Sequence, residues 1–386
     1  MENTPYLYET LVRVLSQHSH WLDRRHLKTL AWMMAGLLHS HSISLGAWTP
    51  FVVSRAQYSE STVRRFRRWL DNDKIEAHSL YGPLMQQALM SWVGKTIYGA
   101  LDTSMLWDTY CIIRLSVVYR GRAVPLVWSV IEHGSSMVAF EVYKALLDRA
   151  AERLPFASKV IFLADRGFAD TDLMTYLKQL GWHFRIRIKA NFWIEHPLEG
   201  WFQVQDLPVV RGQARFRHGI WLTAKHFGLV HLVVARPVAG DDVWYVISDE
   251  PTSVTTLKEY GFRFDIEENF LDDKSNGFQL ESSLIRSAKA LERLCFVLAA
   301  TTLYLVSQGT SVVQRGKRRL VDPHWFRGSS YLKIGWKWVS YALIRGYELI
   351  SSVYLSSECD PEPAMASKQQ DQKQQYRFEF QYQEAA

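Results

Sequence analysis

The sequence has little cysteine and no long apolar run, and each absence excludes a class of protein. Its three cysteines, Cys111, Cys295 and Cys359, are far apart and odd in number, which argues against a disulfide framework and a cysteine-based zinc site. The longest apolar run, at residues 294–306, is too short to span a membrane. No basic region followed by an apolar stretch opens the chain, so no export signal is visible. We therefore expect a cytoplasmic protein with no membrane partner.

The thirteen histidines show no metal-binding spacing such as His-Glu-x-x-His. What the chain does have is 386 residues, 48% of them hydrophobic, and a formal net charge of +6. Length and composition predict a globular protein of two or three domains. The positive charge favours a polyanionic partner, although a basic protein can also simply carry solvated lysines.

Helical periodicity dominates residues 1–92, which we expect to form an all-helical domain. A helix-start signal at Ser59-Glu60-Ser61-Thr62 precedes a cluster of arginines: Arg64, Arg65, Arg67 and Arg68. A helical domain whose later helix presents arginines resembles a helix-turn-helix reader of DNA. The alternative is an ordinary solvated basic face. In the first case the arginines supply salt-sensitive phosphate contacts more than sequence readout.

Two aspartates follow apolar, β-prone segments. Asp102 comes after residues 96–101, and residues 112–118 and 123–130 then form a predicted hairpin, so Asp102 belongs to the first of three antiparallel strands. Asp165 follows the buried-strand pattern of residues 159–164, which is preceded and followed by predicted helices. Sites in open α/β sheets lie beyond the carboxyl ends of parallel strands. Taken alone, each aspartate is more often a turn former or a helix cap.

A third carboxylate lies within residues 260–274. In one continuous helix, Tyr260, Arg263, Glu267 and Lys274 fall within an arc of roughly 60°. We expect the remaining acidic residues of this stretch to face water: Asp265, Glu268, Asp272 and Asp273. Carboxylates are hard ligands for Mg²⁺, and guanidinium and ammonium groups hold phosphate. The alternative is a surface helix with an i,i+4 ion pair.

Together these residues resemble the DDE transposases of the insertion-sequence-4 family. The resemblance is carried by Asp102-Thr103-Ser104, by Asp165-Arg166-Gly167-Phe168, and by the pattern Tyr-x2-Arg-x3-Glu-x6-Lys, matched without a gap at Tyr260, Arg263, Glu267 and Lys274. It covers about residues 95–310. It implies an α/β ribonuclease H-like catalytic core interrupted by a β-rich insertion domain, beside the all-helical N-terminal DNA-binding domain and a helical C-terminal region.

The resulting division has six parts. They are a helical DNA-binding domain (1–92), the first part of the core (93–190), the insertion (191–249), the second part of the core (250–310), a helical C-terminal region (311–357) and a disordered tail (358–386).

The resemblance also implies a mechanism. Asp102, Asp165 and Glu267 would hold two Mg²⁺ ions, for which Mn²⁺ can substitute. Tyr260, Arg263 and Lys274 would grip phosphates beside the scissile bond. The implied steps are nicking at the transposon end, hairpin formation, hairpin hydrolysis and strand transfer into target DNA. The partners would be double-stranded DNA and a second copy of the chain, at the bacterial nucleoid.

Two further segments are candidate DNA contacts. In family members a tryptophan before a strand ending in Glu-Pro helps to hold a flipped base, and the matching residue is Trp244; an exposed indole stacks well on an unpaired base. The alternative is that Trp244 is a core residue. The basic loop of Arg315, Lys317, Arg318 and Arg319 lies on the DNA backbone or only keeps a connection solvated.

Two other functions are consistent with the sequence. One is a DNA-binding protein derived from a transposase that has lost its chemistry. The other is a ribonuclease H-like nuclease without strand transfer. The intact set of three carboxylates speaks against the first, and the β-rich insertion with the Tyr-Arg-Glu-Lys spacing speaks against the second.

Overall fold

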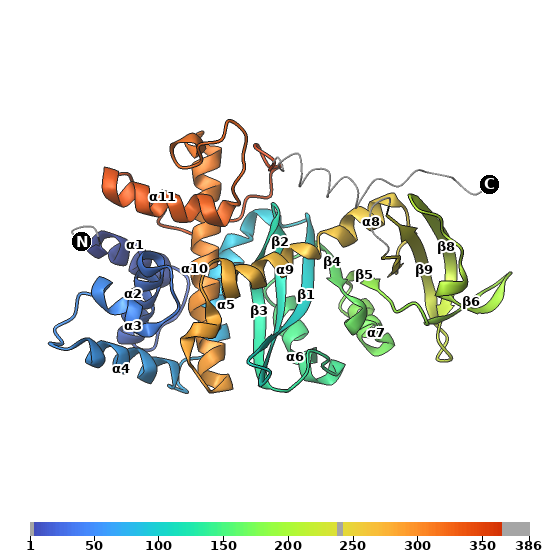
Figure 1. The fold of residues 1–386 in the computed structure, drawn as a ribbon, viewed down its shortest axis with the longest axis horizontal. Coiled ribbons are helices and arrows are strands. Elements are labelled where there is room, and N and C mark those ends of the chain that lie inside the picture. Colours follow the sequence, from blue (N-terminus) through green and yellow to red (C-terminus); the bar gives the residue numbers. More distant parts are fainter. Residues whose placement is uncertain (1–3, 238–241, 365–386) are drawn as a thin grey trace.

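A computed structural model describes residues 4–237 and 242–364. Figure 1 shows a helical region at the amino terminus, a long central helix, and a twisted sheet that continues to the far end of the molecule. Most of the predicted tail, residues 365–386, lies outside the described residues.

Helices make up the amino-terminal region, as predicted for residues 1–92. They are α1 (Thr4–Ser16), α2 (Arg24–Ser40), α3 (Leu45–Trp48), α4 (Ser59–Leu70) and α5 (Ala77–Ala88). The start of α2 is fixed by Asp23, whose carboxylate accepts a hydrogen bond from the Arg25 amide at 2.7 Å. Trp48 is fully buried against α2, where Gly36 leaves room for its side chain. These helices therefore pack around an apolar core of their own side chains.

One ten-stranded mixed sheet forms the rest of the scaffold, in the order β3-β2-β1-β4-β5-β10-β9-β8-β6-β7. Its first half consists of β1 (Thr96–Leu106), β2 (Tyr110–Tyr119), β3 (Arg122–Glu132), β4 (Lys159–Ala164) and β5 (His183–Arg187). β1, β2 and β3 are antiparallel neighbours, whereas β4 lies parallel to β1 and β5 parallel to β4. The three predicted antiparallel strands are confirmed, and the strands before Asp102 and Asp165 are parallel neighbours.

The second half of the sheet lies in the segment predicted as a β-rich insertion. It contains β6 (Trp193–His196), β7 (Gly200–Gln203), β8 (Gln213–Leu222), β9 (Phe227–Arg236) and β10 (Trp244–Ser248). β10 pairs with β5 on one side and with β9 on the other. The insertion is β-rich as expected, and all of its strands among the described residues continue the core sheet.

Four helices accompany the sheet: α6 (Phe140–Ala151), α7 (Thr171–Gln179), α8 (Val254–Gly261) and α9 (Phe264–Leu271). A five-residue π-helix, residues Asp272–Asn276, extends α9. Figure 1 shows α8 and α9 crossing the strands, while α6 and α7 lie toward the lower edge. The predicted single helix over 260–274 is therefore two helices with a turn between them, and Tyr260 belongs to the first.

The central helix is α10 (Ala288–Gln314), and α11 (Tyr331–Arg345) crosses it. By length and composition α10 qualifies as a membrane-spanning helix, but 94% of its most apolar window is buried inside the protein. Two glycines allow the crossing. A Cβ on Gly309 would lie 2.0 Å from the Tyr331 carbonyl oxygen, and a Cβ on Gly335 would lie 1.9 Å from that of Leu305. The two backbones are thus in direct contact.

The chain after α11 is fixed to the protein as far as residue 364. The Asp360 carboxylate accepts hydrogen bonds from Arg327 at 2.9 Å and from Tyr331 at 2.5 Å, and Glu362 pairs with Arg318 at 2.5 Å. Disorder was therefore wrongly predicted for residues 358–364, because mixed charge without an apolar pattern hid a set of specific ion pairs.

Candidate active site

Asp102 and Asp165 lie side by side on neighbouring parallel strands. The residues just before them, Leu101 and Ala164, are register partners in β1 and β4. β4 ends at Ala164, whereas β1 continues to Leu106. Asp165 thus stands at the carboxyl end of its strand, and Asp102 projects from β1 where the neighbouring strand stops.

The sequence Asp165-Arg166-Gly167-Phe168 folds into a tight turn that fixes the Asp165 side chain. Its carboxylate caps the turn by accepting a hydrogen bond from the Gly167 amide at 2.8 Å. A Cβ on Gly167 would lie only 3.0 Å from Asp165 Oδ1. Phe168 is buried against Tyr143, with ring centroids 5.7 Å apart. The cap, the missing side chain and the aromatic anchor together orient the carboxylate.

Arg263 connects Asp102 to Glu267. Its guanidinium Nη1 lies 3.6 Å from Asp102 Oδ2, and its Nη2 donates a hydrogen bond to Glu267 Oε1. The arginine is 7% exposed, whereas the Glu267 side chain is 47% exposed. Glu267 is therefore the member of the group that faces solvent, and the predicted i,i+4 pair is present as part of a larger site.

The protonation of Asp102 reflects this crowding. Burial raises the pKa of its carboxyl to about 6, while the Arg263 charge and a hydrogen bond from the Thr103 amide lower it. The negative charges of Asp165 and Glu267 raise it further. Asp165 and Glu267 are thus both close enough to influence Asp102.

Buried ion pairs hold α9 and its π-helical extension on the sheet. Arg114 of β2, the register partner of Asp102, donates to Asp273 at 2.6 Å and to Asn269 at 2.8 Å. Arg122 lies 3.3 Å from Asp272. Asp272 and Asp273 are 3% and 2% exposed, so the expectation that they face water is wrong. These acidic residues fix the position of α9 over β2 and β3.

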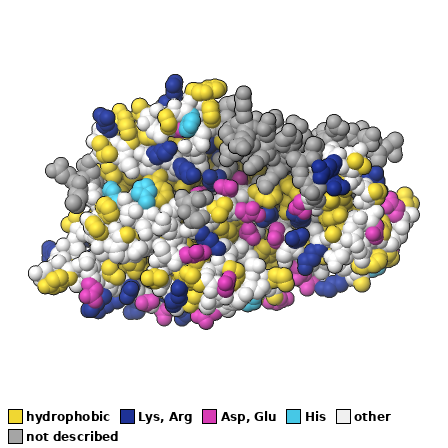
Figure 2. All heavy atoms as spheres, viewed as in Figure 1, with side chains coloured by type: hydrophobic (Ala, Val, Ile, Leu, Met, Phe, Trp, Pro, Cys, Tyr) yellow, Lys and Arg dark blue, Asp and Glu magenta, His cyan; other side chains and the backbone are white. Residues whose placement is uncertain are grey.

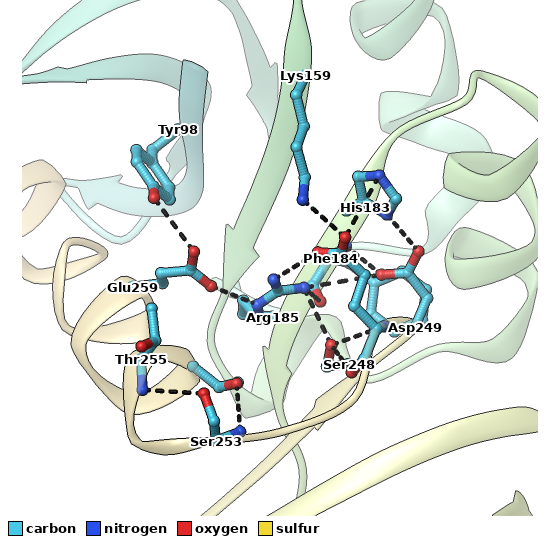
Figure 3. A network of polar contacts seen from close by, with 12 residues as sticks. Tyr98, Lys159, His183, Phe184, Arg185, Ser248, Asp249, Ser253, Thr255 and Glu259 are labelled. Carbon is cyan, nitrogen blue, oxygen red and sulfur yellow. Dashed lines mark hydrogen bonds and ion pairs between the residues drawn. The ribbon is translucent and has the colours of Figure 1, made fainter. Parts of the chain in front are cut away.

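A second polar network holds α8 (Figure 3). Arg185 of β5 donates to Glu259 of α8 at 2.8 Å and to Glu250 at 2.7 Å. Tyr98 of β1 donates to the other oxygen of Glu259, and Lys159 donates to Glu250. Since Arg263 follows Glu259 by one helical turn, this network determines where Arg263 meets Asp102.

The donor chemistry of the site suits a hard divalent cation, because it offers carboxylate oxygens. Among the described residues, no group of three or more acidic, histidine or cysteine side chains is close enough to hold a metal ion. Arg263 is the cation that contacts both Asp102 and Glu267 in this structure. The residues therefore fit Mg²⁺ by type, with a guanidinium beside two of the three ligands.

Two predicted DNA contacts are buried side chains. Trp244 is 4% exposed and Tyr260 is 1% exposed, and their ring centroids lie 5.5 Å apart in an edge contact. Phe264 packs on both rings. The expectation of an exposed indole at Trp244 is wrong, and the alternative of a core residue describes its position. Alternation along β10 places Trp244 on the covered face of the sheet.

Lys274 lies in the π-helix, where its ammonium donates to the Met105 carbonyl of β1 at 2.5 Å. It therefore reaches the strand that carries Asp102, but from a different helical segment than Tyr260. The predicted common face of four side chains is reduced to Arg263 and Glu267, because the chain turns at residues 262–263 and unwinds to a π-helix after Leu271.

Each of the two predicted basic segments contains both exposed and partly or fully buried basic side chains. On α4, Arg64, Arg67 and Arg68 are exposed, and Arg64 pairs with Glu60 at 2.6 Å. Arg65 is partly buried over Phe66, and burial lowers the pKa of its guanidinium.

In the loop, Arg315 and Arg319 are exposed, and the Lys317 ammonium lies over the Tyr347 ring at 5.2 Å. Arg318 is 4% exposed and donates to Glu362 and to the His324 carbonyl. A DNA contact by Arg318 is therefore a wrong expectation: the residue anchors the C-terminal segment.

The structure also shows a site that the sequence reasoning missed. Trp193 and Trp201, on the paired strands β6 and β7, are 49% and 42% exposed. They line a cavity of about 560 Å³ together with Lys189, Phe192 and Thr223. Cross-strand pairing puts both indoles on one face of the hairpin. Short strands with little alternation gave no periodic signal by which exposure could have been predicted.

The sequence also matches a known protein family. A sequence profile described as "Transposase DDE domain" matches residues 109–304, which is just over half of the chain. The chain therefore belongs to the transposase DDE domain family. Asp165 and Glu267 lie within the matched region, and Asp102 lies seven residues before it.

No curated protein matches the chain. Among solved structures, the chain is similar to a piggyBac transposase in a cryo-EM synaptic complex with hairpin DNA, with a TM-score of 0.43 and 10% sequence identity. The alignment covers 90% of this chain and 82% of that one. A likeness of this size carries no conclusion about the function of this chain.

Proposed function

We propose that the protein is a cut-and-paste DNA transposase. It binds the terminal inverted repeats of an insertion sequence, cleaves the ends and joins them to target DNA. One observation carries the proposal: Asp102 of β1 and Asp165 lie side by side where the parallel strand β4 ends, and Glu267 reaches the same place through Arg263. Membership in the transposase DDE domain family agrees with it.

Asp102, Asp165 and Glu267 are the residues that would hold Mg²⁺, which when bound supplies a Lewis acid for phosphodiester cleavage. The chain's own side chains prepare the site for such an ion. The Gly167 amide orients Asp165, the Thr103 amide orients Asp102, and the Arg185 network holds α8 so that Arg263 and Glu267 face them. Glu267, half exposed, is the ligand that DNA would meet first.

The family resemblance supports a pathway within this proposal. The first cut exposes a 3′-hydroxyl at the transposon end, which attacks the opposite strand and forms a hairpin. Water then opens the hairpin, and the freed end attacks target DNA. Arg263 contacts two of the carboxylates, and Lys274 reaches the same strand, β1, at Met105, so these are the cations that we assign to phosphate. Joining two ends to one target requires two active sites, so the active form is a dimer on DNA.

A hairpin unstacks a base at its tip, and an exposed aromatic side chain can hold it. Since Trp244 is buried, we assign this role to Trp193 and Trp201. Their cavity of about 560 Å³ lies within the range of small-molecule sites.

The test is cleavage of labelled DNA carrying the element's own ends, in Mg²⁺ and separately in Ca²⁺, resolved on a denaturing gel. We expect a nick and then a hairpin-length product with Mg²⁺. Asp102→Ala, Asp165→Ala and Glu267→Ala should abolish both products and leave end binding intact. Glu268→Ala, on the same helix and exposed, is the matched control and should cut normally.

A second function rests on one observation: the buried Arg263 guanidinium contacts both Asp102 and Glu267. A DNA-binding protein without chemistry would keep this arrangement permanently. It predicts tight end binding without any cut in Mg²⁺ or Mn²⁺. A nuclease without strand transfer is distinguished by adding a target plasmid, since it would cut the ends but join nothing.

A further inference from the structure

The exposed side of α11 is a stripe of positive charge. Lys333, Lys337 and Arg345 are exposed, and the partly buried Tyr341 completes a series at four-residue intervals. Residues four apart lie on one side of a helix. The opposite side is apolar and buried, including Ile334, Trp338 and Ala342. Over twelve residues the stripe is about 18 Å long.

Little negative charge opposes this stripe. α11 contains no acidic residue, and between residues 315 and 348 the only acidic residues are Asp322, which is buried, and Glu348. Neither Lys337 nor Arg345 pairs with a carboxylate of the described residues. An ordinary solvated helix face mixes both signs, so the one-sided charge of α11 requires a different explanation.

Neighbouring side chains extend the stripe into a basic and aromatic surface. Lys317 lies over the rings of Trp338 and Tyr347, and Tyr347 stacks on Tyr341 with centroids 5.7 Å apart. The Arg345 guanidinium lies 5.9 Å from the Tyr341 centroid. Figure 2 shows dark blue side chains among yellow ones over this part of the molecule. These ring contacts hold Lys317 and Arg345 against the protein beside the stripe.

The stripe begins next to the candidate active site. Burial raises the pKa of Asp272, and the charges of Arg122 and Lys333 act in the opposite direction, so Lys333 lies near that carboxyl. Asp272 directly follows α9, the helix of Glu267. A polyanion lying along α11 therefore reaches the edge of the site.

We propose that the exposed side of α11, with Lys333, Lys337 and Arg345, binds the phosphate backbone of duplex DNA and guides it toward Glu267. This surface deepens the proposed function and rests on it. Along the axis of a DNA duplex each strand carries one phosphate about every 3.4 Å. A stripe of about 18 Å that runs parallel to this axis therefore spans roughly five phosphates of one strand. Such contacts position DNA without reading its sequence.

The test measures duplex binding by fluorescence anisotropy as a function of salt. It compares the wild type with the triple variant Lys333→Ala/Lys337→Ala/Arg345→Ala. The control removes three exposed charges from α6 and α7, as Lys144→Ala/Arg149→Ala/Lys178→Ala. All six substitutions place alanine in an exposed helical position, so folding is preserved.

Each lost phosphate contact lowers the slope of log K against log salt by about 0.9, so the α11 variant should lose two to three units of slope. The factor by which its affinity falls between about 50 and 200 mM salt should then be about 40 times smaller than the factor for the wild type. An unchanged slope, or an equal change in the control, overturns the proposal for α11. A wild type that binds no DNA overturns the proposed function itself, and these outcomes are distinct.

Discussion

Arg263 and Asp102 lie 3.6 Å apart, measured from Nη1 to Oδ2, although Arg263 is in the turn before α9 and Asp102 is in the middle of β1. The guanidinium is 7% exposed and also binds Glu267. It offsets the charge of two carboxylates that would otherwise repel each other.

Arg263→Ala should lower the free energy of unfolding by about 1–3 kcal/mol in the absence of divalent ions, because a buried carboxylate loses its partner. Added Mg²⁺ should raise the melting temperature of the variant more than that of the wild type, since the ion replaces the lost charge. Thermal unfolding with and without Mg²⁺ measures both effects. Arg263→Lys is the control and should respond like the wild type; equal responses of all three proteins would contradict the prediction.

The tryptophans of the insertion should separate into two kinds. Trp244→Ala removes a side chain that is 4% exposed and should cost about 3–5 kcal/mol of unfolding free energy. Trp193→Ala and Trp201→Ala remove exposed indoles and should change stability by less than about 0.5 kcal/mol. These two substitutions should instead weaken the binding of hairpin DNA with an unpaired base.

A fluorescent base analogue at the hairpin tip reports this contact. We expect its quenching to decrease in Trp193→Ala and Trp201→Ala, with blunt duplex DNA as the reference substrate. Unaltered quenching in both variants would remove these residues from the proposed base-holding role.

The Glu250 carboxylate should make stability depend on acid. Burial alone would raise its pKa, but hydrogen bonds from Arg185 and Lys159 lower it to about 2, compared with an ordinary value of 4.5. A lowered pKa in the folded state stabilises the fold above pH 4.5, and this contribution is lost as the pH falls toward 2. Glu250→Gln should therefore be less stable than the wild type at neutral pH, and the difference should shrink in acid.

Urea unfolding at a series of pH values measures this difference. Glu281→Gln, at an exposed position, should run parallel to the wild type throughout. If the Glu250→Gln curve ran parallel as well, the ion pairs with Arg185 and Lys159 would not contribute to folding.

The glycines at the crossing of α10 and α11 should not tolerate a methyl group. Gly309→Ala and Gly335→Ala each place Cβ at or below 2.0 Å from a backbone oxygen, so the helices must separate, at a cost of about 3 kcal/mol or more. Gly46→Ala is the matched control, since its Cβ would meet nothing closer than 3.9 Å. Chemical denaturation of the three variants tests the prediction, and a stability of Gly335→Ala close to that of Gly46→Ala would refute it.

Sequence patterns predicted those parts of the fold that depend on neighbours along the chain. Apolar segments followed by aspartate placed Asp102 on β1 and Asp165 directly after β4, and the two strands pair in parallel. The helices before residue 92 were likewise visible in their periodicity.

Contacts between distant segments were not visible. The burial of Asp273 depends on Arg114, 159 residues earlier, and that of Arg318 depends on Glu362. A charged residue in a sequence looks solvated until its partner is known, so both were predicted on the surface. The helix face through Tyr260 failed for a related reason: the apolar cluster with Trp244 holds Tyr260 in a separate helix.

The pairing of β10 with β5 has a consequence for how the insertion can be lost or exchanged. β3 and β7 are the outer strands of the ten-stranded sheet, so every strand between them has both edges covered. Removing β6 to β9 would uncover the side of β10 that now binds β9, at Val246, Ile247 and their neighbours. An uncovered apolar strand edge recruits other chains and favours aggregation. The insertion therefore shields the catalytic half of the sheet from self-association, whatever else it contacts.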